Sequence, residues 1–353
     1  MHFLDAATRG PAPDFRRTRR AAPGLCHAGA TGMLLRWALA ACCAVPAPAA
    51  FAQATQAAAA AAATPASQAA PAARSGPASP FAAARFSRVI GAGGVPLNVV
   101  ELGDPALPGV LFIHGFRQSI LSWSAQFGSD LSRRCHLVAF DLRGHGNSGS
   151  PWQPAAYDSA QPWGDDVAAV IAATGLKKPL VVGWSFGGNV AMDFASRHPE
   201  LPVAGYLLTG TAGGTSAAAV PPPPPADAPP RPSGSPDLFL NIAAVQGAND
   251  MLFKRERIAP ALQAQFAAAA MRVGPWVEQA VARRPRTDTA APNAPLTFAT
   301  GDQDPIIGAA TVTRLKAMFP QARFVDFPGS GHAAFIEDAA RFDALVDELQ
   351  CGH

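Results

Sequence analysis

Short apolar runs alternate with helix-like segments along the chain from residue 86 onward, and their spacing predicts strands and helices in turn. The expected strands are 110–113, 136–140, 180–182, 203–208, 296–300 and 323–327. The expected helices are 122–134, 163–174, 189–195, 310–319 and about 338–349. Ahead of them, residues 85–90 and 95–101 flank a glycine-rich turn and predict an antiparallel hairpin. The alternation predicts an α/β fold, with a mostly parallel sheet and helices on both faces.

The alternation breaks over residues 211–290, where no run predicts a strand. Prolines fill positions 221–225, and helical spacing of apolar residues follows over 238–282. Ligands enter α/β sheets at the carboxyl ends of the strands, so an insertion at this end predicts a small helical lid. Residues 213–236 are expected to be a flexible spacer at its entrance.

The first eighty residues are rich in Ala, Pro, Arg and Ser and offer little bulky apolar surface for a core. The apolar run 33–45 and the sequence Ala50-Phe51-Ala52 predict a signal peptide, cleaved before Gln53, and export to the periplasm or the medium. The rival interpretation is a lipoprotein lipidated at Cys42, which alone would imply membrane contact. Whether the chain starts at Met1 or at Met33 stays open.

These patterns predict three parts of the chain. They are a leader over 1–52 with its signal peptide near 33–52, a disordered Ala/Pro-rich linker over 53–80, and an α/β domain over 81–350 with a lid at 211–290.

The net charge of +3 comes from the leader, because removing residues 1–52 leaves 22 basic and 23 acidic side chains. A nearly neutral mature chain gives no support for nucleic-acid binding. Only Cys135 and Cys351 lie outside the leader, and they either form a disulfide or remain as two thiols. No spacing of His, Cys, Asp or Glu suggests a metal site.

A short apolar, β-branched run stops at a serine held between glycines, in the sequence Val181-Val182-Gly183-Trp184-Ser185-Phe186-Gly187-Gly188. A helix pattern resumes immediately afterwards. A sharp strand-to-helix turn exposes the serine hydroxyl, and only neighbours without side chains, here Gly183 and Gly187, let strand and helix pass so closely. The alternative is a glycine-rich turn whose serine caps the following helix.

Four further motifs follow expected strands. They are His114-Gly115-Phe116, Asp141-Leu142-Arg143-Gly144-His145-Gly146-Asn147-Ser148, Gly301-Asp302-Gln303-Asp304 and Gly331-His332. Together with the turn at Ser185, they resemble the serine-nucleophile branch of the α/β-hydrolase superfamily, over about residues 86–350. The order of nucleophile, acid and histidine is the order that this fold uses.

The resemblance implies a catalytic triad of Ser185, Asp304 and His332, with no metal and no cofactor. It also implies an oxyanion hole made of the backbone N–H groups of Phe116 and Phe186. Asp302 competes with Asp304 for the role of the acid, but the family pattern places the acid three residues after the glycine.

Four other residues in these motifs receive structural interpretations. His114 and Asp141 are expected to brace loops, His145 to hydrogen-bond within its loop, and Trp184 to pack beside the pocket.

The same resemblance implies a serine hydrolase that cleaves a small-molecule carboxylic ester, lactone or thioester through an acyl-enzyme. Cofactor-free perhydrolysis and cleavage of C–C bonds beside a carbonyl use the same triad and stay open. A non-catalytic secreted binding protein is a third alternative, from another class. Serine at the turn argues against the haloalkane dehalogenases and epoxide hydrolases of the superfamily, which carry Asp there. The particular substrate and the oligomeric state stay open.

Overall fold

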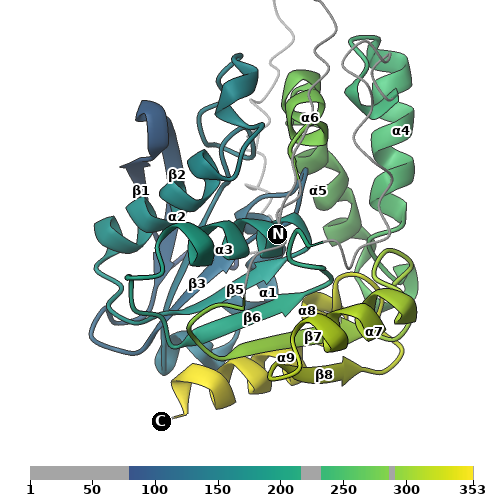
Figure 1. The fold of residues 1–353 in the computed structure, drawn as a ribbon. Helices are drawn as coiled ribbons and strands as arrows, with labels where there is room; N and C mark the ends of the chain where they lie inside the picture. The colour runs from purple at the N-terminus through teal and green to yellow at the C-terminus, as the bar shows by residue number, and fades with distance from the viewer. Residues whose placement is uncertain (1–78, 216–231, 286–290, 353) are drawn as a thin grey trace, which may run out of the picture. The chain divides into compact units, whose positions relative to one another are not determined.

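The computed structural model describes residues 79–215, 232–285 and 291–352 (Figure 1). The expected leader, the signal peptide and all but the end of the linker lie outside the described residues, and so does the proline run at 221–225. Within the described ranges, no helix is both long and apolar enough to cross a membrane.

The described strands form one eight-stranded sheet in the order β1-β2-β4-β3-β5-β6-β7-β8. Their bounds are β1 (Arg85–Ile90), β2 (Pro96–Leu102), β3 (Gly109–Ile113), β4 (His136–Phe140), β5 (Leu180–Trp184), β6 (Gly205–Thr209), β7 (Leu296–Gly301) and β8 (Arg323–Phe327). β2 pairs with β1 and with β4 in antiparallel fashion, and the other neighbours are parallel. The expected hairpin and the mostly parallel sheet are therefore confirmed.

Helices cover both faces of this sheet. The α-helices are α1 (Ser124–Phe127), α2 (Gln161–Thr174), α3 (Phe186–Arg197), α4 (Leu238–Asp250), α5 (Pro260–Ala270), α6 (Pro275–Ala282), α7 (Ala309–Met318), α8 (Ala334–Glu337) and α9 (Ala339–Val346). Leu111 and Ile113 of β3 pack in one apolar cluster with side chains of α2, α3 and α7. Val110 and Phe112 pack in a second cluster with side chains of α8 and α9. Strands buried on both faces need apolar residues at successive positions, which explains the continuous runs in the sequence.

The helix expected over 122–134 is wrong as a single element. The structure has the 3₁₀ turn η2 (Ile120–Trp123), the short α1 and a second 3₁₀ turn, η3 (Asp130–Arg133). Gly128 ends α1, and the Ser129 side chain accepts the Leu131 N–H to start the next turn. Trp123, Phe127 and Leu131 are nevertheless all buried, so the apolar spacing reports a shared buried face rather than one continuous helix.

The carboxyl-terminal end of the chain is fixed by a disulfide between Cys135, just before β4, and Cys351. Their Cα atoms lie 5.5 Å apart, and 216 residues separate them in sequence. This pairing resolves the alternative that the sequence left open. The closing helix is also shorter than expected, because α9 gives way to a π-helical turn over Asp347–Cys351.

A helical insertion, residues 232–285, lies between β6 and β7 and contains the 3₁₀ turn η5 (Pro232–Gly234), α4, α5 and α6. Asp237 caps α4 by accepting the N–H groups of Phe239 and Leu240. The helical stretch expected over 238–282 is present as three separate helices, with breaks over residues 251–259 and 271–274. β6 and β7 are direct neighbours in the sheet, with Tyr206 opposite Leu296, so the chain leaves one strand and returns to the next.

Candidate active site

Ser185 stands between β5 and α3 in a conformation that is rare for a residue with a side chain, with φ 52° and ψ −119°. Its backbone N–H donates to Thr209 O at 2.9 Å, which ties the turn to β6. A Cβ atom on Gly183 would lie 2.7 Å from Gly187 O, and one on Gly187 would lie 2.2 Å from Ile113 O. Neither position tolerates a side chain, so the two glycines permit the close approach of strand and helix.

The structure brings Ser185, His332 and Asp304 into one hydrogen-bonded chain. His332 Nε2 lies 2.9 Å from Ser185 Oγ, and His332 Nδ1 lies 2.9 Å from Asp304 Oδ2 and 3.1 Å from Oδ1. The Asp304 and His332 side chains are almost fully buried, whereas Ser185 is partly accessible. Asp302, the competing acid, instead accepts the Gly329 N–H at 2.6 Å and braces the turn before His332.

Asp304 is held as a carboxylate. Burial, the largest single influence, raises its pKa, but the hydrogen bond and charge of His332 and the N–H groups of Ile306 and Ile307 outweigh burial. The net result is a pKa below the ordinary value of an aspartate. A buried carboxylate beside Nδ1 keeps the ring proton on that nitrogen, which leaves Nε2 free to accept a proton from the serine.

The backbone N–H groups of Phe116 and Phe186 flank the turn at Ser185. Neither donates to any acceptor within residues 79–215, 232–285 and 291–352. Phe186 is the first residue of α3, where an N–H group has no partner inside the helix. The two phenyl rings meet edge to face, with centroids 5.8 Å apart.

The family model for the "Alpha/beta hydrolase family" matches residues 110–345, which is more than half of the chain and includes all three residues of the hydrogen-bonded chain. The chain is an α/β hydrolase. The resemblance stated from the sequence motifs is confirmed at the level of fold and family.

The chain is similar to several proteins whose names describe an esterase or a hydrolase. The structure of a putative aryl esterase from Burkholderia cenocepacia is 29% identical, covers 75% of this chain and 98% of that one, and superposes with a TM-score of 0.68. The AB hydrolase superfamily protein YisY of Bacillus subtilis is 26% identical over 68% of this chain and 90% of its own length. The bifunctional esterase/perhydrolase DCH of Acinetobacter calcoaceticus is 35% identical over 115 residues, 33% of this chain and 41% of that protein.

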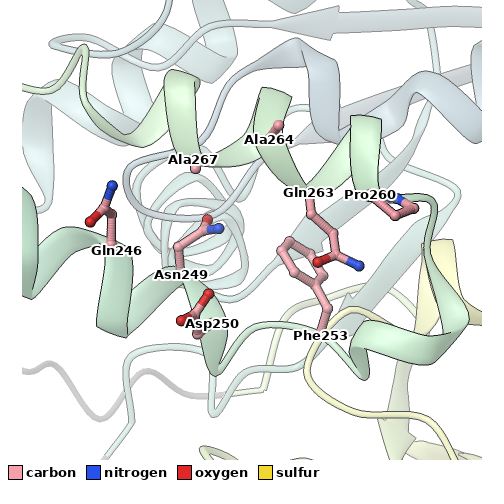
Figure 2. A pocket seen from close by; sticks show the side chains of 8 residues that line it. All are labelled: Gln246, Asn249, Asp250, Phe253, Pro260, Gln263, Ala264 and Ala267. Atoms are coloured by element: carbon pink, nitrogen blue, oxygen red, sulfur yellow. The ribbon is translucent and has the colours of Figure 1, made fainter.

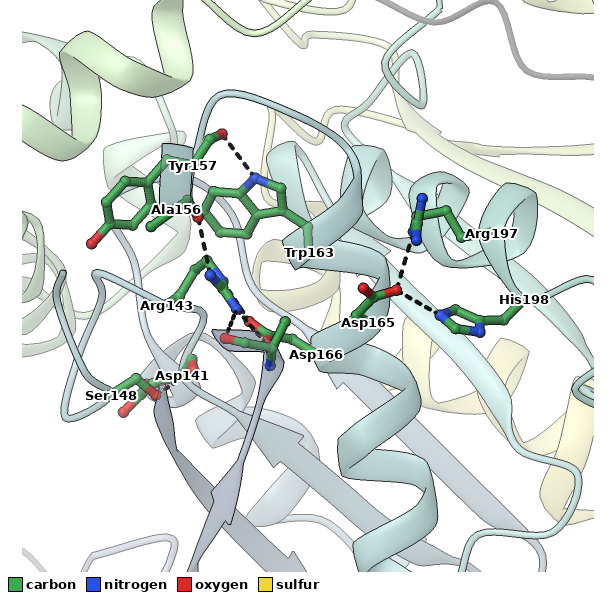
Figure 3. Close-up of polar contacts among 11 residues, drawn as sticks. Asp141, Arg143, Ser148, Ala156, Tyr157, Trp163, Asp165, Asp166, Arg197 and His198 are labelled. Carbon is green, nitrogen blue, oxygen red and sulfur yellow. Dashed lines mark hydrogen bonds and ion pairs between the residues drawn. The ribbon is translucent and has the colours of Figure 1, made fainter. Parts of the chain in front are cut away.

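The loop Asp141–Ser148 of the hydrolase braces the site from the side of α2. Arg143 makes a two-pronged ion pair with Asp166, with both N–O distances 2.7 Å, and donates to Ala156 O (Figure 3). Asp141 accepts the N–H groups of Ile120 and Asn147, each at 2.8 Å. The structural interpretation of this motif is therefore supported, since its charged groups are bonded within the fold.

The two other histidines near the site are neutral. Burial lowers the pKa of His114 to about 4 and the pKa of His145 to about 3. His114 Nδ1 donates to Gly115 O at 2.8 Å and its Nε2 accepts the Leu142 N–H at 2.9 Å, which joins two loops. His145 Nδ1 donates to Arg143 O at 2.8 Å.

Two contacts of the site had no signal in the sequence. Trp184 Nε1 donates to His332 O at 2.9 Å, so this indole holds the histidine's backbone in addition to packing beside it. Arg117, which follows Phe116, is buried and pairs with Glu278 of α6. The partners lie 148 and 161 residues apart, a separation at which no periodic pattern links them.

A cavity of about 370 Å³ opens between α4 and α5 of the insertion (Figure 2). It is lined by Gln246, Asn249, Asp250, Phe253, Pro260, Gln263, Ala264 and Ala267. One of these residues, Asn249, accepts a hydrogen bond from Gln118 at 3.3 Å and so touches the loop that carries Phe116. The described part of the chain holds no cluster of three or more His, Cys, Asp or Glu side chains suited to a metal ion.

Proposed function

We propose that this α/β hydrolase is a serine hydrolase that cleaves a carboxylic ester, lactone or thioester through an acyl-enzyme intermediate. The main support is the row of hydrogen bonds that joins Ser185 Oγ to His332 and His332 to Asp304, each with a distance of 2.9 Å. An esterase among the solved neighbours supports the same reaction class.

In the proposed mechanism, Ser185 Oγ attacks the carbonyl carbon of the substrate while His332 Nε2 takes the hydroxyl proton. Asp304 stabilises the imidazolium that forms. The oxyanion accepts hydrogen bonds from the N–H groups of Phe116 and Phe186, and loss of one such donor costs about 3 kcal/mol of transition-state stabilisation. His332 then returns the proton to the leaving group, and water attacks the acyl-enzyme by the same route in reverse.

A fluorophosphonate probe tests this proposal, because it phosphonylates an activated serine. The wild-type protein should be labelled at Ser185 and should hydrolyse p-nitrophenyl esters. The Ser185→Ala variant should lose both properties while keeping its fold, since the glycines and not the hydroxyl shape the turn. Ser87→Ala, at a half-buried position on β1, is the matched control and should retain both. Unchanged labelling in Ser185→Ala would refute the proposal.

Perhydrolysis is the second candidate, favoured by the match to a bifunctional esterase/perhydrolase. The same acyl-enzyme would be attacked by hydrogen peroxide instead of water, giving a peracid and the free serine. The experiment is ester turnover in the presence of peroxide, with peracid trapped by a halide-dependent dye. Ester turnover without peracid formation would exclude perhydrolysis and support hydrolysis as the reaction.

We also propose that the protein is exported, with a mature terminus near Gln53. The disulfide between Cys135 and Cys351 supports this proposal, because disulfides persist in oxidising compartments. Sequencing the terminus of the protein made in its own cells decides the question. A lipidated Cys42 would favour the lipoprotein, and an intact Met1 would refute export.

A further inference from the structure

Arg117 has two unusual properties for an arginine. Its φ is 60°, and in the described part of the chain Arg117 and Ser185 are the two non-glycine residues with a positive φ. Its side chain is also only 8% exposed. A backbone conformation that is rare for residues with side chains persists only where the surrounding structure enforces it, and Arg117 directly follows a predicted oxyanion donor.

The Arg117 guanidinium joins three separate elements of the helical insertion. Nε donates to Glu278 Oε2 on α6 at 3.0 Å, and Nη1 donates to Ala270 O at the end of α5 at 3.2 Å. Nη2 donates to Ser233 O in η5 and also to Glu278. The Glu278 side chain is 13% exposed, so the pair is shielded from water and salt. Only a planar fork with several donors satisfies all these acceptors together.

The same loop meets the insertion at a second point. The Gln118 side chain donates to Asn249 of α4 at 3.3 Å, and the Gln118 N–H closes a turn on Gly115 O at 3.2 Å. The two residues after Phe116 are thereby held by side-chain contacts to the insertion, and the bond from the Gln118 N–H to Gly115 O closes the loop around Phe116.

The insertion also reaches the other predicted donor. The Arg284 guanidinium lies 5.7 Å from the centroid of the Phe186 ring, and Arg284 pairs with the buried Asp193 on α3. Both predicted oxyanion donors therefore lie beside ion pairs between the insertion and the sheet domain.

We propose that Arg117 is a positioning residue that fixes the Phe116 N–H toward the oxyanion, so the oxyanion hole is complete only when the insertion is seated on Arg117. The inference rests on the proposed serine mechanism and extends it. It assigns the insertion a part in transition-state stabilisation, in addition to any role in admitting substrate.

The test uses three variants of the full chain. Arg117→Gly keeps the positive φ, which glycine adopts readily, but removes the anchor. Arg117→Lys keeps the charge but loses the fork. Glu278→Gln keeps an acceptor oxygen but removes its charge. It tests the same contact from the other partner if the changes at Arg117 prevent folding. Arg133→Gly, which removes an exposed arginine of η3 that pairs with Asp130, is the matched control.

The readouts are kcat and KM on a small p-nitrophenyl ester and the affinity for an aryl trifluoromethyl ketone, whose serine adduct carries an oxyanion. Removing one oxyanion donor typically costs 10²–10³ in kcat. We expect Arg117→Gly to lose about 10–100-fold in kcat with KM within about threefold, because the donor is misdirected rather than deleted. Affinity for the ketone should fall by the same factor as kcat/KM. For Arg117→Lys and Glu278→Gln, kcat and ketone affinity should lie between those of the wild type and those of Arg117→Gly.

A purely structural role predicts a different pattern, in which thermal stability falls while kcat and ketone affinity stay at wild-type values, and that pattern would overturn the inference. A loss confined to KM would overturn it as well. Failure of the wild type to be labelled at Ser185 would instead refute the proposed function, so the two failures are distinguishable.

Discussion

Replacing Asp304 by asparagine should lower turnover by about four orders of magnitude without unfolding the protein. Asp304 Oδ1 accepts the N–H groups of Ile306 and Ile307 at 2.7 and 2.9 Å, while Oδ2 faces His332 Nδ1. In the asparagine variant, only the amide oxygen accepts those two N–H groups, so the NH₂ group takes the position of Oδ2. An amide donor then faces Nδ1, and the ring proton moves to Nε2.

A histidine protonated on Nε2 cannot take the proton of Ser185, 2.9 Å away. In a serine-protease triad, the equivalent change of acid to amide costs about 10⁴ in kcat, which corresponds to about 5.5 kcal/mol of activation free energy. The assay is p-nitrophenyl ester hydrolysis, with enzyme concentration corrected by circular dichroism and active-site titration.

Asp302→Asn is the matched control two residues away. Its side chain is exposed and accepts the Gly329 N–H, and an amide oxygen preserves that bond. Turnover should stay within about threefold of the wild type, since no triad contact changes. If Asp302→Asn proved the more damaging change in a folded protein, or if Asp304→Asn lost less than tenfold, the assignment of the acid would be wrong.

Three more outcomes are expected. Replacing Cys135 and Cys351 together by serine should lower the unfolding free energy by about 5 kcal/mol in denaturant titrations, from the chain entropy of a 216-residue separation, with kcat unchanged. Burial raises the pKa of Asp193 to about 7, so this carboxyl binds more protons folded than unfolded between pH 4 and 7. The wild type's stability relative to Asp193→Asn should therefore shrink as pH rises across that window, by at most about 1.4 kcal/mol per unit, and a growing difference would contradict it. Deleting residues 217–231 should spare turnover of small esters while changing preference among bulky ones, if the insertion is a lid; loss of folding would instead make the segment part of the core.

Most of the fold could be predicted from the sequence, because the buried strands are continuous apolar runs and their alternation with helices predicts a mostly parallel sheet. The order of the strands in the sheet was not predicted. Ser185, Asp304 and His332 were predictable as a set because each ends or follows such a strand, and the structure brings them into contact. The broken helix after η2 was missed, because Trp123 and Phe127 keep helical spacing across the break.

Polar contacts between residues far apart in the chain could not be predicted from the sequence. Arg117 reads as an ordinary loop arginine, and nothing near position 278 marks its partner. Two cysteines without a pattern allow either pairing or free thiols, so only their 5.5 Å Cα separation decides. Such contacts depend on how distant segments meet, which local spacing does not encode.

The placement of the insertion between neighbouring strands makes it a module that protein engineers could exchange. β6 and β7 pair directly, with Thr209 opposite Ala299, so the sheet frame that carries the triad loops is complete without residues 210–295. Because β6 and β7 run parallel, a grafted segment must cross a face of the sheet from the end of β6 back to the start of β7, which takes about a dozen residues or more. It must also bring acceptors for the Arg117 guanidinium. A donor segment without them should be transplanted into the Arg117→Gly background, where no buried cation is left without a partner.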